Sequence, residues 1–276
     1  MIPHEYYLPA ISPVLLSAVL SILLVYVSCG FLISLFTKNN GLADVLYGPG
    51  ILLVSLSAYL LSFTKTTGAL VIVGAVLVWS VRLATRIYRK NRGKAEDFRY
   101  KTWRDTWGNT FLVRSYFQIY ILQGVIMVLV AAPSLTATLL PSSSIFLPAF
   151  IFGMVLWVSG FVLEARADYE LDTFIREVKR GDTSRGKIMK FGLWAYSRHP
   201  NYFGESLQWW GLAVAATGVS SLPLFAYISP VLITFLLLKV SGVPLLEKHF
   251  EGDPEWEEYK TKTSVFFPRS PQKILL

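Results

Sequence analysis

The stretch AISPVLLSAVLSILLVYVSCGFLISLF, residues 10–36, contains no charged side chain. A helix needs about 20 mostly apolar residues to cross the hydrocarbon core of a bilayer, so this stretch is long enough to span it. It is too long for the core of a cleaved signal peptide, and no lysine or arginine precedes it. We therefore expect a retained transmembrane helix.

The whole chain shares this apolar character. Of its 276 residues, 53% are hydrophobic and 16% are charged, which is typical of an integral membrane protein and not of a soluble one. The net charge of +8 is explained by basic loops on the cytoplasmic side, so we expect no nucleic-acid partner. The single cysteine, Cys29, lies inside an apolar run and is expected to serve packing. No metal site is expected.

Further apolar runs predict six more spans. The seven expected spans are 10–36, 46–63, 68–83, 115–132, 145–163, 205–220 and 222–246. If the polar segments 84–114 and 164–204 are cytoplasmic, 24 of the 26 lysines and arginines fall on that side. The prediction is one all-α domain over residues 1–276, a seven-helix bundle with its N-terminus outside and its C-terminus in the cytoplasm. The expected location is a bacterial inner membrane, or the endoplasmic reticulum in a eukaryotic host.

A basic cluster, RKNRGKAEDFRY at residues 89–100, follows the third expected span. Such a cluster can simply anchor a span on the cytoplasmic side. However, Glu96 and Asp97 interrupt the basic run, which an anchor does not require, and Asn91 with Gly93 predicts a turn. Guanidinium groups around such a turn suit phosphate oxygens, so we expect anion binding here. The candidate residues are Arg82, Arg86, Asn91, Arg92, Lys94, Asp97, Arg99 and Arg104.

An acidic row follows the fifth expected span, in EARADYELDTF at residues 164–174. Glu164, Asp168 and Asp172 are spaced by four residues, so they share one face if the stretch is helical. This face is either solvated or accepts hydrogen bonds from hydroxyl or amide groups of a ligand, as an acidic residue does for a ribose. The chain has no GxGxxG motif, which excludes a Rossmann domain.

The third polar cluster is GLWAYSRHPNYFGE, residues 192–205. Pro200 interrupts a regular helix there, and Asn201 is expected near the N-terminus of the span that begins around residue 204. A helix N-terminus favours anions. Tyr196 and Tyr202 are typical of the membrane interface. Arg198 and His199 remain as candidate ligand contacts, although a histidine beside a membrane is often just hydrogen-bonded to the protein.

Ionisable residues also lie at the edges of the expected spans. Charge near a membrane is costly and marks either function or pairing. Glu205 and Lys239 could neutralise each other, and Glu247 ends the last span. Asp44, at the cytoplasmic end of the second span, has no evident partner in the sequence.

These motifs, together with LLKVSGVPLLEK at residues 237–248, resemble the broad bacterial branch of the steroid 5-alpha-reductase family. The resemblance runs from about residue 38 to 268. It implies a seven-span, NADPH-dependent reductase of a carbon–carbon double bond conjugated to a carbonyl, with 3-oxo-Δ4 steroids as the best-known substrates. It also implies a lipophilic substrate taken from the bilayer. Oligomeric state is not predicted.

The resemblance also implies roles for individual residues. The family's cofactor-binding positions match Lys38, the turn at 91–94, Asp168 with Glu164 before it, and Asn201 with Glu205. The full set of expected cofactor contacts is Lys38, Arg82, Arg86, Asn91, Arg92, Lys94, Asp97, Arg99, Arg104, Glu164, Asp168, Tyr196, Arg198, His199, Asn201, Tyr202, Glu205 and Glu247.

The family's catalytic glutamate matches Asp44, a shorter acid. Its catalytic tyrosine finds no match at Trp79 and Ser80, so Tyr47 and Tyr88 are the possible substitutes. Hydride transfer to an enone places negative charge on the carbonyl oxygen, and a positioned acid stabilises it. With no cation expected nearby, Asp44 would keep its proton and donate it, with Tyr47 one turn on.

Two other functions fit part of the sequence. Membrane isoprenylcysteine carboxyl methyltransferases carry a similar RHP-x-Y-x-G run and bind S-adenosylmethionine. The basic cluster at 89–100 favours a cofactor with phosphates instead. A lipid-binding scaffold would explain the spans but not three polar clusters expected on one side of the membrane.

Overall fold

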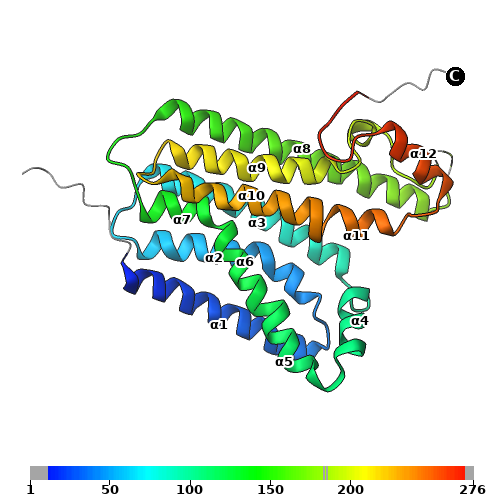
Figure 1. Ribbon diagram of the computed structural model, residues 1–276, viewed down its shortest axis with the longest axis horizontal. Coiled ribbons are helices and arrows are strands. Elements are labelled where there is room, and N and C mark those ends of the chain that lie inside the picture. Colours follow the sequence, from blue (N-terminus) through cyan, green and yellow to red (C-terminus); the bar gives the residue numbers. More distant parts are fainter. Residues whose placement is uncertain (1–11, 183, 185, 271–276) are drawn as a thin grey trace, which may run out of the picture. The chain divides into compact units, whose positions relative to one another are not determined.

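The computed structural model describes residues 12–182, 184 and 186–270, and Figure 1 shows their arrangement. This part of the chain is helical, without any β-strand, and its one isolated β-bridge pairs Pro141 with Ser220. The expected all-α class is confirmed. The chain forms two compact units, Met1–Phe150 with Ala215–Ser229 and Ile151–Val214 with Pro230–Leu276.

The first unit is built around one central helix. Its elements are α1 (Pro13–Thr37), α2 (Leu42–Leu61), α3 (Thr67–Asn91), α4 (Phe98–Trp107), η1 (Gly108–Thr110), α5 (Phe111–Ser115), η2 (Tyr116–Ile121), α6 (Leu122–Val130), α7 (Ala132–Leu139) and η4 (Pro223–Tyr227). Helix α2 packs against α1, α3, α6 and α7. Its Ile51, Val54 and Ala58 are almost fully buried, as is Trp79 of α3. Because α2 is central, its first turn fixes where Asp44 lies.

The second unit contains most of two long helices and a short C-terminal one. Its elements are α8 (Leu147–Lys179), η3 (Gly192–Ala195), α9 (Pro200–Thr217), α10 (Ile228–Phe235), η5 (Leu236–Val240), α11 (Val243–Lys248) and α12 (Pro254–Lys262), of which α8, α9 and α10 extend a few residues into the first unit. Asp253 caps the N-terminus of α12, because its carboxylate accepts hydrogen bonds from the backbone N–H groups of Glu255 and Trp256.

Helices α8 and α9 run antiparallel with their backbones in contact. Two glycines on each helix, seven residues apart, make this approach possible. A Cβ added at Gly160 would lie 2.6 Å from the carbonyl oxygen of Gly204, and one at Gly211 would lie 2.5 Å from the backbone nitrogen of Trp157. These distances are too short for any larger side chain without movement of a backbone.

The described residues contain six helical segments that are long and apolar enough to cross a membrane. They are Pro13–Thr37, Leu42–Leu61, Thr67–Asn91, Phe98–Val130, Leu147–Lys179 and Pro223–Lys248. They correspond to six of the seven expected spans, although residues 10 and 11 of the first lie outside the described residues. The remaining expected span, 205–220, corresponds to α9, which carries Asn201, Glu205 and Gln208 and does not reach this level of apolarity. The count of seven and the orientation of the termini stay predictions.

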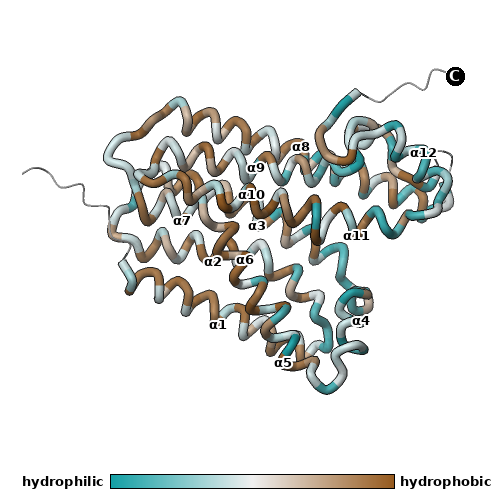
Figure 2. Tube along the Cα trace, in the orientation of Figure 1, coloured by the Kyte–Doolittle hydropathy of each residue, from teal (hydrophilic) through white to brown (hydrophobic). Residues whose placement is uncertain are grey.

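Several helices extend beyond the apolar runs that predicted them. Helix α3 continues through Arg82 and Arg86, and α8 continues through the acidic row to Lys179. Much of the two expected polar segments, 84–114 and 164–204, is therefore helical. Within the first unit, Figure 2 shows hydrophilic residues gathered around α4 and the C-terminal end of α3.

We predict that Gly211→Ala lowers the stability of the protein by about 1–3 kcal/mol, because the added methyl group forces α8 and α9 apart. Gly74→Ala in α3 is the matched control, since a Cβ there meets no atom within 4 Å. It should leave stability unchanged or raise it by up to about 1 kcal/mol through helix propensity. Thermal unfolding of both variants in detergent measures this, and equal unfolding temperatures would refute the close contact.

Candidate functional site

Asp44 forms the centre of a partly buried polar cluster in the first unit. Its Oδ2 accepts a hydrogen bond from Nη2 of Arg99 at 2.8 Å, and its Oδ1 accepts one from the hydroxyl group of Tyr100 at 2.7 Å. Asp44 lies in the first turn of α2, whereas both donors lie in the first turn of α4. Tyr100 is 4% exposed, so its hydroxyl group is held away from bulk water.

Arg99 is shared between two carboxylates. Its Nε also donates to Oδ1 of Asp97 at 2.9 Å, and the same oxygen caps α4 by accepting from the backbone N–H of Arg99 at 3.0 Å. Partial burial of Asp97 works to raise its pKa, but the hydrogen bonds from Arg99 outweigh this and the pKa is lowered. The guanidinium of Arg99 therefore pairs with two carboxylates. Asp44, Asp97 and Arg99 together carry one negative charge more than they carry positive charges.

The expectation that Asp44 lacks a partner is wrong. With Arg99 at 2.8 Å, the absence of a nearby cation no longer explains why Asp44 would keep a proton. Tyr100 was not among the candidate residues, although it is the last residue of the basic cluster at 89–100. Tyr47, the second expected catalytic residue, is partly buried on α2, and its ring lies edge-on to Trp79 at 6.4 Å.

A second ion pair ties α4 to the turn between α1 and α2. Arg104 donates to both oxygens of Glu96, at 3.2 and 2.9 Å, and its guanidinium lies 4.2 Å from the centre of the Phe111 ring. The same carboxylate accepts a hydrogen bond from the backbone N–H of Asn40 at 2.8 Å. Arg104 and Glu96 thus fix α4 relative to Asp44.

The turn expected at residues 91–94 is confirmed. Asn91 ends α3, Gly93 takes a left-handed conformation with φ of +73°, and the N–H of Lys94 donates to the carbonyl oxygen of Asn91 at 3.1 Å. Arg92 and Lys94 are exposed, as is Lys38 at the end of α1. Arg82 and Arg86 differ from them because they lie partly buried along α3. The exposed cations are the ones available to phosphate.

In the second unit, the acidic row pairs with amides of α9. Nε2 of Gln208 donates to Oε2 of Glu164 at 2.6 Å, and Nδ2 of Asn201 donates to Oδ1 of Asp168 at 3.1 Å. Both carboxylates are buried, whereas Asp172, one turn on, is exposed. The row is therefore not a fully solvated face. Gln208 was not among the candidates, although it lies on the same predicted span as Glu205.

The amide oxygens of these pairs have unused capacity. Oδ1 of Asn201 and Oε1 of Gln208 are buried and accept no hydrogen bond. Together with the two carboxylates they form a strip of acceptors along α8 and α9. Hydroxyl or amide N–H groups of a ligand match such a strip, because buried acceptors are normally satisfied.

Arg198, His199 and Glu247 bind one another. Nε of Arg198 and Nε2 of His199 approach Oε1 of Glu247 at 2.9 and 3.0 Å. Nη1 of Arg198 also donates to the carbonyl oxygens of Lys260 and Thr263, at 3.2 and 2.8 Å. These three candidates therefore join the segment before α9 to α11 and α12.

The other candidates of this segment occupy different surroundings. Pro200 begins α9, four residues before the expected start, so the helix interruption is confirmed. Tyr202 stacks on His199 with ring centres 5.4 Å apart, and Tyr196 is 48% exposed. Glu205 is partly buried in the second turn of α9.

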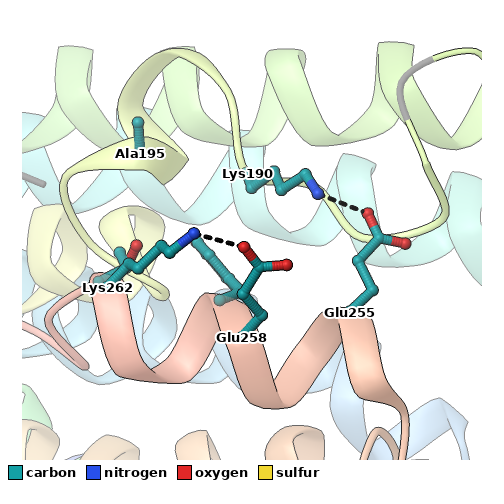
Figure 3. A pocket seen from close by; sticks show the side chains of 7 residues that line it. Lys190, Ala195, Glu255, Glu258 and Lys262 are labelled. Atoms are coloured by element: carbon teal, nitrogen blue, oxygen red, sulfur yellow. Dashed lines mark hydrogen bonds and ion pairs between the residues drawn. The ribbon is translucent and has the colours of Figure 1, made fainter. Parts of the chain in front are cut away.

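A surface hollow of about 220 Å³ in the second unit does not involve the candidate residues. Figure 3 shows that its charged side chains point toward one another, Lys190 toward Glu255 at 2.8 Å and Lys262 toward Glu258. Burial works to raise the pKa of Glu255, but Lys190 and the backbone N–H of Lys187 lower it overall. Charges that are already paired make this hollow a poor ligand site.

Comparison with known proteins gives matches over most of the chain. The family model described as "Protein of unknown function (DUF1295)" matches residues 30–263. An uncharacterised protein of Schizosaccharomyces pombe is 28% identical over 294 aligned positions, which cover 94% of this chain and 80% of that protein. No solved structure matches.

Shorter matches link the chain to mammalian enzymes named 3-oxo-5-alpha-steroid 4-dehydrogenase 1. The human enzyme is 32% identical over 72 residues, which cover 26% of this chain and 26% of that enzyme. The mouse enzyme is 33% identical over 69 residues, which cover 25% and 26%. The chain thus aligns with about a quarter of the length of these relatives.

We predict that Arg198→Ala lowers the stability of the cofactor-free protein by about 3–5 kcal/mol, because it leaves the partly buried Glu247 without its cation. The control is Arg166→Ala, which removes a 65% exposed arginine that pairs with Glu170 one turn on and should cost less than about 1 kcal/mol. Thermal unfolding without ligand separates the two. If Arg198→Ala unfolds like the control, its role lies in ligand binding instead.

Proposed function

This chain belongs to the DUF1295 family, and we propose that it reduces the carbon–carbon double bond of a lipophilic enone with NADPH. The substrate we favour is a 3-oxo-Δ4 steroid, reduced at its Δ4 bond. The proposal is supported by the short matches to 3-oxo-5-alpha-steroid 4-dehydrogenases and by the polar cluster around Asp44. The observation that carries it is the hydrogen bond of 2.7 Å between Tyr100 and Asp44.

Enone reduction requires an acid at the carbonyl oxygen, and Tyr100 can be that acid. Negative charge develops on this oxygen as the β-carbon is reduced, and a buried donor stabilises it more than water does. The hydroxyl group of Tyr100 keeps its proton in the absence of substrate, because the phenolate would face the negative charge of Asp44. It gives the proton up only to the negative charge that develops on the substrate oxygen. In our proposal, the hydroxyl group of Tyr100 turns its single proton from Asp44 to the substrate oxygen when the substrate binds, and Oη then donates that proton.

Asp44 and Arg99 position this hydroxyl group. Asp44 accepts its hydrogen bond, and the guanidinium of Arg99 lies 5.4 Å from the centre of the Tyr100 ring. A cation at that distance stabilises the phenolate that remains after proton transfer. Asp44 therefore acts through Tyr100 and is not itself the donor, while Tyr47 remains a candidate for a second hydroxyl contact.

Each unit, taken by itself, contains residues that suit chemical groups found in NADPH. The exposed cations Lys38, Arg92 and Lys94, beside the turn at Gly93, suit phosphate groups, including one at a ribose 2′ position. The unused acceptors of Asn201 and Gln208, with their carboxylate partners, suit hydroxyl and amide N–H groups. When bound, NADPH supplies the hydride.

We also propose the topology expected from the sequence. In it, α9 also spans the membrane, as the sixth of seven spans, and its polar groups are tolerated there because Glu164 and Asp168 pair with them. The basic residues then face the cytosol, where NADPH is available, and the substrate enters from a bacterial inner membrane.

We predict that Tyr100→Phe lowers kcat for enone reduction by about 100-fold or more, since a general acid contributes roughly 10²–10⁴-fold. The Kd for NADPH should stay within about twofold, because the phenol is not proposed to bind the cofactor. Tyr169→Phe is the control, since Tyr169 is exposed on α8. Steady-state kinetics in detergent and fluorescence titration measure both values. A Tyr100→Phe variant with normal kcat would remove the phenol from the mechanism.

The phosphate assignment is tested by charge removal. Arg92→Ala and Lys94→Ala should each raise the Kd for NADPH about 10- to 100-fold, because a charge-assisted hydrogen bond contributes about 1.5–3 kcal/mol. The Kd for NADH should change less, because it lacks the 2′-phosphate. Lys101→Ala removes the same charge from an exposed position on α4 and serves as control. Equal weakening for NADPH and NADH would argue against a contact with the 2′-phosphate.

A further inference from the structure

The central helix α2 has a backbone defect close to Asp44. Pro49 lies inside the helix and has no N–H group, so it cannot donate to the carbonyl oxygen of Val45, four residues before it. The first turn of α2, which carries Asp44, is therefore joined to the rest of the helix by one hydrogen bond fewer than usual. Contacts from outside the helix backbone then decide how firmly Asp44 is held.

Side chains from two other helices donate hydrogen bonds to this part of α2. Nε2 of Gln123, in α6, donates to the carbonyl oxygen of Ala43 at 2.9 Å. The hydroxyl group of Tyr26, in α1, donates to the carbonyl oxygen of Leu46 at 2.9 Å. Ala43 directly precedes Asp44, and Leu46 follows it two residues later, so the two hydrogen bonds bracket the carboxylate along the chain.

Close packing holds both donors against α2. A Cβ added at Gly50 would overlap the sulfur atom of Met127, in α6, and would lie 3.1 Å from the ring of Tyr26. Helices α1 and α6 therefore both contact α2 directly after Pro49. Gln123 follows the π-helical segment η2, whose wider turns change which residues of α6 face α2. Both donor side chains are partly buried.

Small movements of Asp44 have large consequences in the proposed mechanism. Its carboxylate holds the hydroxyl group of Tyr100 at 2.7 Å, and a displacement of about 1 Å can lower a catalysed rate about 100-fold. On the other side of this contact, α4 is already fixed by the Glu96–Arg104 pair. The two hydrogen bonds to the carbonyl groups of α2 provide the corresponding hold on the side of Asp44.

We propose that Gln123 and Tyr26 are positioning residues. They hold the first turn of α2 despite the missing hydrogen bond at Pro49, and this hold keeps Asp44 in contact with Tyr100. Neither side chain contacts the reacting atoms. The hold on α2 depends on the hydrogen bonds alone, whereas its catalytic consequence rests on the proposed reductase function.

The hold on α2 is tested without any assay of activity. Gln123→Met keeps the length of the side chain but removes the donor, and Tyr26→Phe removes only the hydroxyl group. Each variant should speed hydrogen–deuterium exchange of the amides at 46–48 about tenfold, because local opening then breaks one hydrogen bond fewer. Residues 52–61 of α2 should exchange as in the wild type. Unchanged exchange at 46–48, or equally faster exchange along all of α2, would overturn the hold.

Matched controls make the same chemical changes elsewhere in the first unit. Gln118→Met changes an exposed glutamine of η2, and Tyr59→Phe changes a tyrosine of α2 that lies beyond Pro49. Neither control should change exchange at 46–48, which mass spectrometry of proteolytic fragments measures for the protein in detergent.

The link to the proline is tested by Pro49→Ala, which supplies an N–H group for the carbonyl oxygen of Val45. In this background, Gln123→Met should speed exchange at 46–48 by less than about threefold, because the helix backbone then shares the hold. The same tenfold effect in both backgrounds would show that Gln123 does not compensate for the proline.

The catalytic consequence is tested by steady-state kinetics. Gln123→Met should lower kcat about tenfold or more, because the hydroxyl group of Tyr100 is then held less firmly. The KM for the enone and the Kd for NADPH should stay within about twofold of the wild type. Gln118→Met should match the wild type in all three. A normal kcat in Gln123→Met would overturn the positioning role.

A double substitution separates positioning from a general structural effect. In a Tyr100→Phe background, Gln123→Met should lower kcat no further, because both changes act on the same hydroxyl group. An equal loss in both backgrounds would overturn the positioning role. If the wild type reduces no enone, the catalytic consequence fails with the proposed function, whereas hydrogen–deuterium exchange still decides the hold on α2.

Discussion

The shared hydrogen bonding of Asp44 by Arg99 and Tyr100 is the interaction on which the account of this protein depends. It joins the first turn of α2, the central helix of the first unit, to the first turn of α4. Because α2 is held on several sides by other helices, the carboxylate is fixed. The hydroxyl group of Tyr100 is therefore fixed as well, and a fixed donor in a water-poor setting is what an acid catalyst requires.

The residues around this cluster hold it in place and set its net charge. The Glu96–Arg104 pair and the backbone of Asn40 hold α4 against the turn between α1 and α2. One guanidinium for two carboxylates leaves a negative charge that favours proton uptake. The exposed cations of the neighbouring turn at 91–94 are free of these contacts, so their charge remains available to a ligand. The second unit, taken by itself, contains buried acceptors, which the close contact of α8 and α9 brings together.

The sequence was sufficient for the parts of the fold that depend on local chemistry. Apolar length predicted six helices that are long and apolar enough to cross a membrane, and Pro200 and Gly93 predicted an interruption and a turn that are both present. The helical spacing of Glu164 and Asp168 was also readable, because side chains four residues apart share a helix face. The seven-residue spacing of Gly204, Gly211 and Gly218 is also visible in the sequence. It is typical of a close contact between helices, which the sequence analysis did not predict.

Contacts between distant residues could not be read in this way. Asp44 and Arg99 are 55 residues apart, and nothing local to Asp44 indicates a cation. For the same reason Gln208 was missed as the partner of Glu164. Arg198 shows the converse error. Its charge suggested a contact with a ligand, but its guanidinium pairs with Glu247 and donates to two carbonyl groups of the same chain.

The most direct test of the central claim uses the purified wild-type protein with NADPH that carries deuterium at the transferable position. With a 3-oxo-Δ4 steroid as substrate, we expect the saturated ketone with one deuterium on its β-carbon, formed in step with the oxidation of NADPH. A protein that folds and binds NADPH but transfers no deuterium to this or any other enone would contradict the account.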